Sequence, residues 1–162
     1  MNIDPKALGL VALMALTGPS LAQGAGGTID VGGWKIRETR EEGKFQGCSA
    51  TNTFDDQSVI GLAATKDVTF MIVSEPKSRL TKDQMYQVKY KFDSGKQSVT
   101  QGKANGPDLI FVPMPDNDVK GFMAANFVHF SYGGLDYDEP LDGSTDAIAQ
   151  MGKCMDAGMA EK

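Results

Sequence analysis

Short stretches in which apolar and polar residues alternate recur along most of this chain of 162 residues. The clearest is 85–92 (MYQVKYKF), whose aromatic and valine side chains fall on one face and whose glutamine and lysine side chains fall on the other. Residues 34–40 (WKIRETR) begin in the same way. A period of two is that of a β-strand with one buried and one solvated face. The sequence therefore predicts a mainly β protein.

Turn-forming residues divide these stretches into seven or eight predicted strands. The strands are expected at 34–40, 45–54, 59–64, 68–73, 85–92, 97–103, 109–112 and 126–132. Residues 68–73 (VTFMIV) are almost wholly apolar, which predicts a central strand with both faces covered. Residues 113–118 are predicted to form a loop, 121–125 a short helical turn, and 126–132 the last strand.

The apolar period changes near the end of the chain. Asp142 and Ser144 are good helix N-caps, and Asp146 lies where the helix dipole favours an acid. One apolar helical face is formed by Ala147, Ile148, Met151, Cys154 and Met155. We therefore expect a helix over 144–158, packed on an antiparallel β-sandwich or on a closed sheet.

The N-terminus has the three-part pattern of a secretory signal peptide. Lys6 precedes an unbroken apolar run at 7–16, and Ser20 and Ala22 supply the small residues of a cleavage site. Ten apolar residues are too few to cross a bilayer, which takes roughly 20, so no membrane span is expected after cleavage. The alternative is a buried N-terminal helix. The organisation expected is a signal peptide at 1–22, a flexible glycine-rich lead-in at 23–33 and one domain at 34–162.

The chain contains two cysteines, Cys48 and Cys154. In an exported protein an even count predicts a disulfide, here one that joins the second strand to the C-terminal helix. The alternatives are two buried thiols or a redox pair, although a redox pair usually has a C-x-x-C spacing. Export and a disulfide together predict a periplasmic protein or, alternatively, a secreted one.

The formal net charge of −5 argues against some partners. Proteins that bind nucleic acids or anionic membrane surfaces need clustered lysine and arginine side chains. We therefore expect neither nucleic acid nor a lipid surface as the partner.

Candidate catalytic groups are few. His129 is the one histidine, and a Ser–His–Asp triad would have to use it, but no G-x-S-x-G motif marks a nucleophile. A zinc site would lack ligands if both cysteines are paired. The sequence therefore predicts no catalytic residues, no cofactor and no enzymatic activity.

An acidic stretch before the C-terminal helix offers one alternative. Oxygen ligands for Ca²⁺ could come from Asp136, Asp138, Glu139 and Asp142. The EF-hand pattern fails because Pro140 and Leu141 occupy positions where that loop needs a ligand and a glycine. A solvated loop followed by a helix cap explains the same residues, and paired carboxylates of a hydrolase are a further alternative.

Several short motifs together resemble those of a known group of proteins. They are GGWKI at 32–36, C-x-A at 48–50, Y-x-V-x-Y-x-F-D-x-G at 86–95 and L-D-G-S-x-x-A-I-x-x-M-x-x-C at 141–154. The set resembles small exported alphaproteobacterial proteins and, more distantly, the invasion-associated locus B family. That resemblance implies a periplasmic β-sandwich linked to host-cell invasion. The chain lacks the additional mid-chain cysteines of that family, and no catalytic residue carries over.

These observations favour a non-enzymatic exported envelope protein. It would act as a binding, inhibitor or interaction module for an envelope or extracellular protein or ligand. The alternative is a hydrolase or a calcium-dependent protein that uses the acidic stretch at 136–142.

Overall fold

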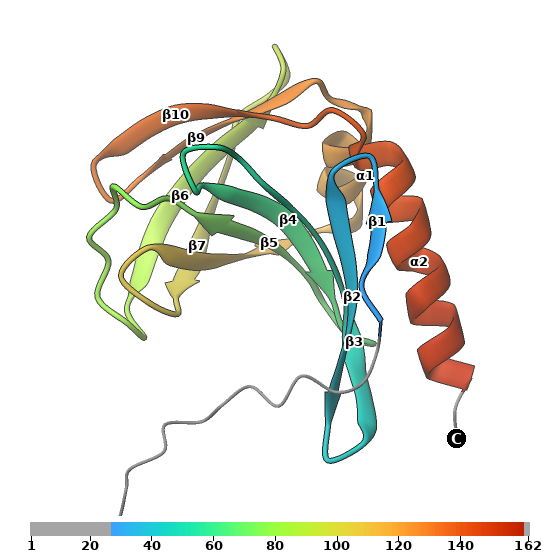
Figure 1. The fold of residues 1–162 in the computed structure, drawn as a ribbon. Helices are drawn as coiled ribbons and strands as arrows, with labels where there is room; N and C mark the ends of the chain where they lie inside the picture. Colours follow the sequence, from blue (N-terminus) through green and yellow to red (C-terminus); the bar gives the residue numbers. More distant parts are fainter. Residues whose placement is uncertain (1–26, 161–162) are drawn as a thin grey trace, which may run out of the picture.

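The structure, a computed structural model, describes residues 27–160. The predicted signal peptide at 1–22 and the first residues of the predicted lead-in lie outside this range. The described chain forms one antiparallel sheet of ten strands together with two helices (Figure 1). The mainly β class and the C-terminal helix are therefore confirmed.

The elements have the following bounds. The strands are β1 (Ile29–Val31), β2 (Trp34–Glu41), β3 (Lys44–Thr53), β4 (Val59–Ala64), β5 (Thr69–Ser74), β6 (Met85–Phe92), β7 (Ser98–Ala104), β8 (Leu109–Met114), β9 (Phe127–Tyr132) and β10 (Leu135–Pro140). The helices are α1 (Asp116–Ala124) and α2 (Ser144–Ala160).

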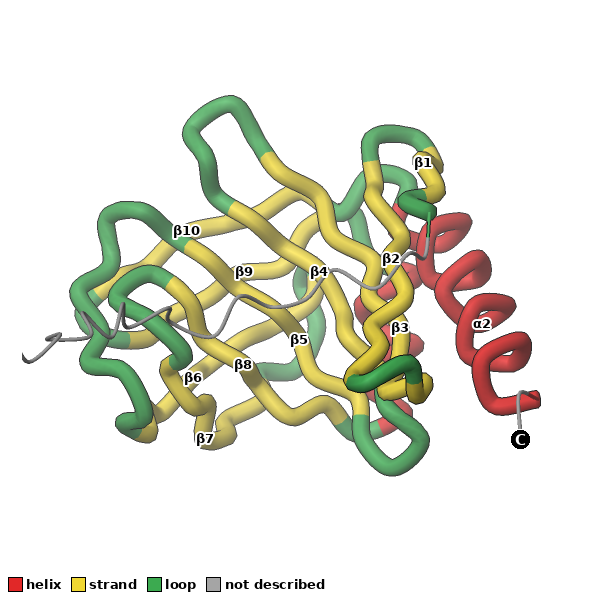
Figure 2. Tube along the Cα trace, turned by 60° about the horizontal axis from the view of Figure 1, so that its bottom comes forward, coloured by secondary structure: helices red, strands yellow, loops and turns green. Residues whose placement is uncertain are grey.

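The strand order across the sheet is β1-β2-β3-β4-β5-β8-β7-β6-β9-β10. The sheet bends strongly, so that its two halves face each other across the core (Figures 1 and 2). Its edge strands β1 and β10 do not pair with each other in the described range, so the sheet is open and the prediction of a closed sheet is wrong. A single bent sheet also replaces the two sheets of a sandwich, because alternation along a strand does not specify which strand it pairs with.

Two strands arise where the sequence analysis expected none. β1 lies in the predicted flexible lead-in, and β10 lies in the predicted acidic loop. Each is joined to its neighbour by a Gly-Gly turn with positive φ angles, 56° and 91° at Gly32 and Gly33 and 56° and 83° at Gly133 and Gly134. Glycine pairs are favoured in two-residue hairpins because both central residues need positive φ. The glycines therefore build hairpins here, and the strand count rises to ten.

The predicted loop at 113–118 and short turn at 121–125 are replaced by the nine-residue helix α1. Pro115 stands at its N-cap with a φ of −70°, and Asp116 and Asp118 occupy its first turn. Acids in that turn are favoured by the helix dipole. Phe122 of α1 is buried and meets the Trp34 ring edge-on at 6.1 Å.

The predicted helix α2 is confirmed and extends to residue 160. Its buried face includes Ile148, Met151 and Met155, and it packs on β2 and β3. The Trp34 indole N–H donates a hydrogen bond of 2.7 Å to the carbonyl of Asp142, just before the helix. The core thus lies between the inner face of the sheet and the two helices.

The strand β5 differs from its prediction. It lies centrally, between β4 and β8, but only its inner face, with Met71 and Val73, is fully buried. Phe70 and Ile72 on the outer face are half-buried, since no other layer of the described chain covers them. The apolar run therefore predicted the central position of this strand correctly, but it did not show that the outer face is left uncovered.

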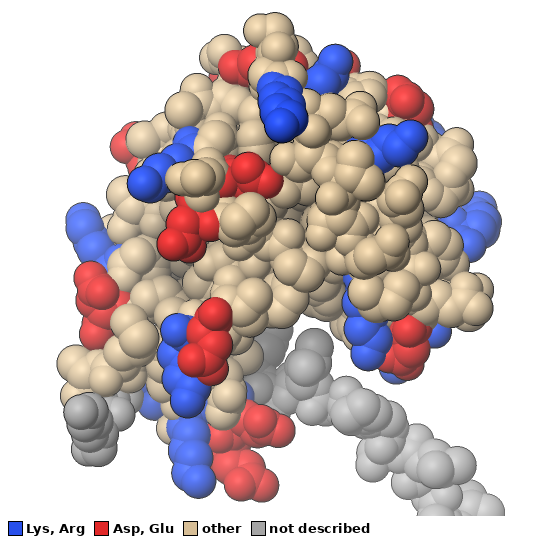
Figure 3. Space-filling model, turned by 180° about the vertical axis from the view of Figure 1, so that it is seen from behind, with Lys and Arg blue, Asp and Glu red and all other residues tan. Residues whose placement is uncertain are grey.

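The described residues contain no helix with both the length and the apolar character needed to cross a bilayer. On the face seen in Figure 3, basic and acidic side chains are interspersed around the margin, with uncharged side chains between them.

Candidate functional site

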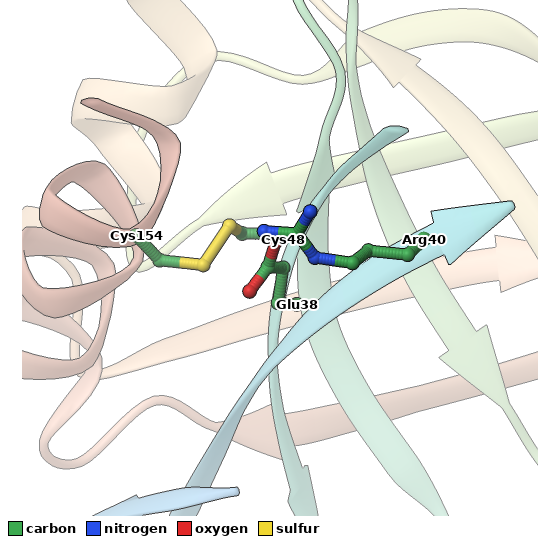
Figure 4. The surroundings of a disulfide bond; sticks show 4 residues. All are labelled: Glu38, Arg40, Cys48 and Cys154. Atoms are coloured by element: carbon green, nitrogen blue, oxygen red, sulfur yellow. Dashed lines mark ion pairs between the residues drawn. A yellow bond between two sulfur atoms is a disulfide. The ribbon is translucent and has the colours of Figure 1, made fainter. Parts of the chain in front are cut away.

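Cys48 of β3 and Cys154 of α2 form a disulfide, in agreement with the predicted pairing. Their Cα atoms are 6.2 Å apart (Figure 4). Glu38 lies opposite Cys48 in the β2–β3 register, and the Arg40 guanidinium pairs with the Glu38 carboxylate at 2.6 Å. The disulfide lies beside this ion pair and joins the helix to the sheet, so its role is structural.

His129 lies on the outer face of β9, opposite Asp138 of β10. Its Nδ1 is 2.8 Å from a carboxylate oxygen of Asp138, and its Nε2 is 3.3 Å from one of Asp136. Both ring nitrogens therefore face carboxylates. The arrangement is a cross-strand cluster of one imidazole and two carboxylates on the outer surface of the sheet.

The four residues considered for calcium are not brought together. Asp136 and Asp138 point outward from β10, whereas Glu139 is buried on the other face of that strand. Asp142 lies beyond the strand, where its carbonyl accepts the Trp34 hydrogen bond. Within residues 27–160 no three histidine, cysteine, aspartate or glutamate side chains are grouped as metal ligands would be.

Glu139 is the carboxyl group of the described chain whose pKa is raised into the neutral range. The residue is only 6% exposed and lies near Ser58, whose hydroxyl donates a hydrogen bond of 2.7 Å to Asp56. Burial raises the pKa of Glu139 to about 7, and the nearby carboxylates of Asp56 and Glu75 act in the same direction. It lines a hollow of about 500 Å³ between the β3–β4 turn and the end of β10. The alternation of Tyr137 with Glu139 along β10 was the sequence pattern that could have revealed this burial.

A second hollow lies between the β6–β7 turn and the start of α1. We call it the α1 groove; it has a volume of about 710 Å³. The Tyr90 hydroxyl donates a hydrogen bond of 2.5 Å to Asp118, and the Ser98 hydroxyl donates another of 3.2 Å to the same oxygen. Burial and the Asp118 carboxylate raise the pKa of Tyr90, so its hydroxyl stays protonated at neutral pH. The groove is therefore lined by hydroxyl groups, by one carboxylate and by the basic side chain of Lys96.

A third hollow, of about 320 Å³, lies on the outer face of the sheet. We call it the Phe70 groove; it is lined by Phe70, Met85, Gln101, Lys103, Asn105, Phe111 and Pro113. The Phe70 and Phe111 rings pack edge-on with their centroids 6.3 Å apart, and Met85 is 57% exposed. Lys103 is the one charged residue of its lining. Apolar side chains gathered in this way on an exposed face are typical of a surface that binds a partner.

The Phe70 groove was missed in the sequence because its parts come from four strands whose order in the sheet, β5-β8-β7-β6, differs from their order in the chain. The one indication was the apolar run at 68–73, which was interpreted as a fully covered strand.

Comparisons with known proteins show a similarity of fold. No family model matches the chain, and no curated protein matches it. Among solved structures, the chain is similar to the crystal structure of invasion-associated protein B from Bartonella henselae. The TM-score is 0.59 and the identity 16%, over 80% of this chain and 97% of that one. The distant structural resemblance expected from the motifs is therefore confirmed, at the level of the fold.

Proposed function

We propose that this chain is a non-enzymatic exported protein that binds a partner through the Phe70 groove. The observation that carries the proposal is the half-buried pair of phenylalanines beside the exposed Met85, on a sheet face that no described element covers. Interfaces are enriched in aromatic and methionine side chains at their centres. Water excluded from these side chains would supply the binding energy.

Two further features support this proposal. The disulfide Cys48–Cys154 fits an oxidising compartment, the periplasm or the cell exterior. The structural neighbour is named as invasion-associated, and a partner in the envelope or on a host surface fits such a role.

Photo-crosslinking in the producing cell tests the proposal. A benzophenone side chain replaces Met85 in one variant and Lys153, exposed on α2, in another. We expect a defined crosslinked species from position 85 and none from position 153.

A second substitution in the same experiment tests whether the groove itself is the binding surface. Phe111→Ser should remove the species formed at position 85. Phe127→Ser should leave it, because Phe127 is an exposed phenylalanine outside the groove. Equal crosslinking at both positions, or none at position 85, would overturn the proposal. A calcium-dependent crosslink that Asp138→Asn abolishes would favour the acidic stretch instead.

A further inference from the structure

The sheet is split between β7 and β8. β8 pairs along its whole length with β5, six residues against six. β7 pairs with β6 from Ser98 to Lys103. Between β7 and β8, however, only two pairs form, Lys103 with Phe111 and Ala104 with Ile110. The two strands therefore separate within the sheet, and residues 98–102 of β7 have no partner strand on that side in the described chain.

The backbone groups that face the gap follow from the hydrogen bonds on either side. The N–H of Ala104 donates to Gln84, on the β6 side, and the N–H of Asn105 donates to Leu109, on the β8 side. Backbone groups alternate in direction along a strand. Val99 and Gln101 therefore present their N–H and C=O groups to the gap.

Pro113 explains why the ladder stops. The Lys103–Phe111 register places Gln101 opposite Pro113 in the next hydrogen-bonded pair. Proline has no N–H to donate, and in sheets it is confined to edges for that reason. A residue that normally marks a sheet edge thus lies in the interior of this one.

The gap is bordered by open space on both faces of the sheet. The Phe70 groove lies on the outer face and the α1 groove on the other side, and Pro113 lines both. Val99, at the free part of β7, is 54% exposed. A free backbone edge with a groove on each side is the arrangement used in binding by strand addition.

We propose that the gap between β7 and β8 accepts one extended segment of a partner protein as an added strand. This proposal rests on the proposed function and names the binding mode of that same surface. Main-chain hydrogen bonds to Val99 and Gln101 hold the segment. Its side chains alternate between the two grooves, so it carries apolar residues toward Phe70 and Phe111 and hydroxyl residues toward Ser98 and Asp118.

The occupant is a single extended segment, because the gap lies between two strands of the sheet. The edge of a folded sheet brings its neighbouring strand with it and does not fit there. The edges of a second copy of this chain are also poor donors, since β1 has three residues and β10 ends in Pro140.

The test uses a synthetic seven-residue probe of alternating threonine and isoleucine that carries a fluorophore. Binding to the oxidised protein is followed by fluorescence anisotropy, and exchange of the Val99 and Gln101 amides by NMR. We expect saturable binding and an exchange rate at both amides at least about 10-fold slower in the complex. Of two control peptides, one carries N-methyl groups on its isoleucines and the other carries them on its threonines. The peptide whose methyl groups block the edge that faces β7 should lose binding.

A protein variant closes the gap from the other side. Pro113→Val restores an N–H that can donate to the Gln101 carbonyl, so the ladder should extend and the Gln101 N–H should in turn donate to the carbonyl of residue 113. The Gln101 amide should therefore become protected in the free protein, and the probe should bind at least about 10-fold more weakly. Pro76→Val, at an exposed proline that lines neither groove, should bind the probe as the unmodified protein does.

Three results would overturn strand addition: no binding of the probe, equal binding of all three peptides, or Val99 and Gln101 amides that exchange in the free protein as slowly as those between β6 and β7. A crosslink at position 85 that persists alongside any of these results would leave the proposed function standing and remove only this binding mode.

Discussion

The two ends of the bent sheet are held in different ways. At the β1–β3 end, α2 is joined to the sheet by a disulfide, by buried apolar side chains and by the Trp34–Asp142 hydrogen bond. At the β9–β10 end, the inner surface meets the β3–β4 turn through the buried carboxyl group of Glu139. The first end combines covalent and apolar contacts, which are insensitive to pH. The second includes a group whose charge changes near neutral pH, so the two ends should respond differently to mutation and to pH.

The largest effect is expected from breaking the disulfide. Cys154→Ser or Cys48→Ser should lower the free energy of unfolding by about 2–5 kcal/mol, because the bond restricts the unfolded chain over a long loop. The double variant should cost little more than either single one, since the same bond is lost in each. Urea unfolding of the four proteins under oxidising conditions measures this. Single-variant costs that add in the double variant would contradict a bond between the two residues.

Two glycines of α2 offer a matched test of its packing. A Cβ at Gly158 would lie 2.1 Å from the ring of Phe45, whereas a Cβ at Gly152 would have nothing within 4 Å. Gly158→Ala should therefore destabilise the protein by about 1–3 kcal/mol through overpacking. Gly152→Ala should stabilise it by about 0.5–1 kcal/mol, because alanine is the better helix former. Thermal unfolding compares the two, and equal shifts of Tm would mean that this end of α2 is not docked on β3.

The smallest effect of the three concerns Glu139. Its pKa is raised from 4.5 to about 7 in the folded protein, so folding favours the protonated carboxyl group. That contribution is complete below pH 4.5 and is lost as the pH rises to 7. The pKa difference corresponds to about 3 kcal/mol in full, and water in the hollow that the carboxyl group lines reduces this to about 1–2 kcal/mol.

Denaturant unfolding between pH 5 and pH 8 checks the Glu139 prediction. Glu139→Gln should remove this part of the pH dependence and should be more stable than the unmodified protein at pH 8. Glu41→Gln, at an exposed carboxylate, should change neither the pH dependence nor the stability at pH 8. A Glu139→Gln variant with the same pH profile as the unmodified protein would show that the carboxyl group is solvated.

The strands were predictable where one face is buried and the other is solvated. In β2 and β6 the alternation of side chains is a direct consequence of the pleat, so the sequence identified the strands and their inward residues. The helix α2 was predictable for the same kind of reason, since caps and a period of 3.6 are local features. The Gly32–Gly33 hairpin was also predictable, but the stretch at 23–33 was interpreted as a flexible lead-in, and the Gly133–Gly134 turn was given no interpretation.

The candidate site was much less predictable. Phe70, Met85 and Phe111 lie on three different strands, and their meeting depends on the strand order β5-β8-β7-β6. Nor does any local pattern show that Pro113 faces β7 rather than solvent. Both depend on long-range pairing, which a single sequence does not specify.

By itself, then, the sequence determined the β class, the C-terminal helix, the cysteine pair and the inward face of most strands. These follow from periodicity, capping and cysteine count, which act between residues near one another in the chain or through a single covalent bond. Only the tertiary structure decided that the strands form one open sheet, that Glu139 is buried while Asp136 and Asp138 are not, and that a gap opens at Pro113. The physical reason is that each of these depends on which backbone edge meets which, and edges carry the same N–H and C=O groups whatever the side chains.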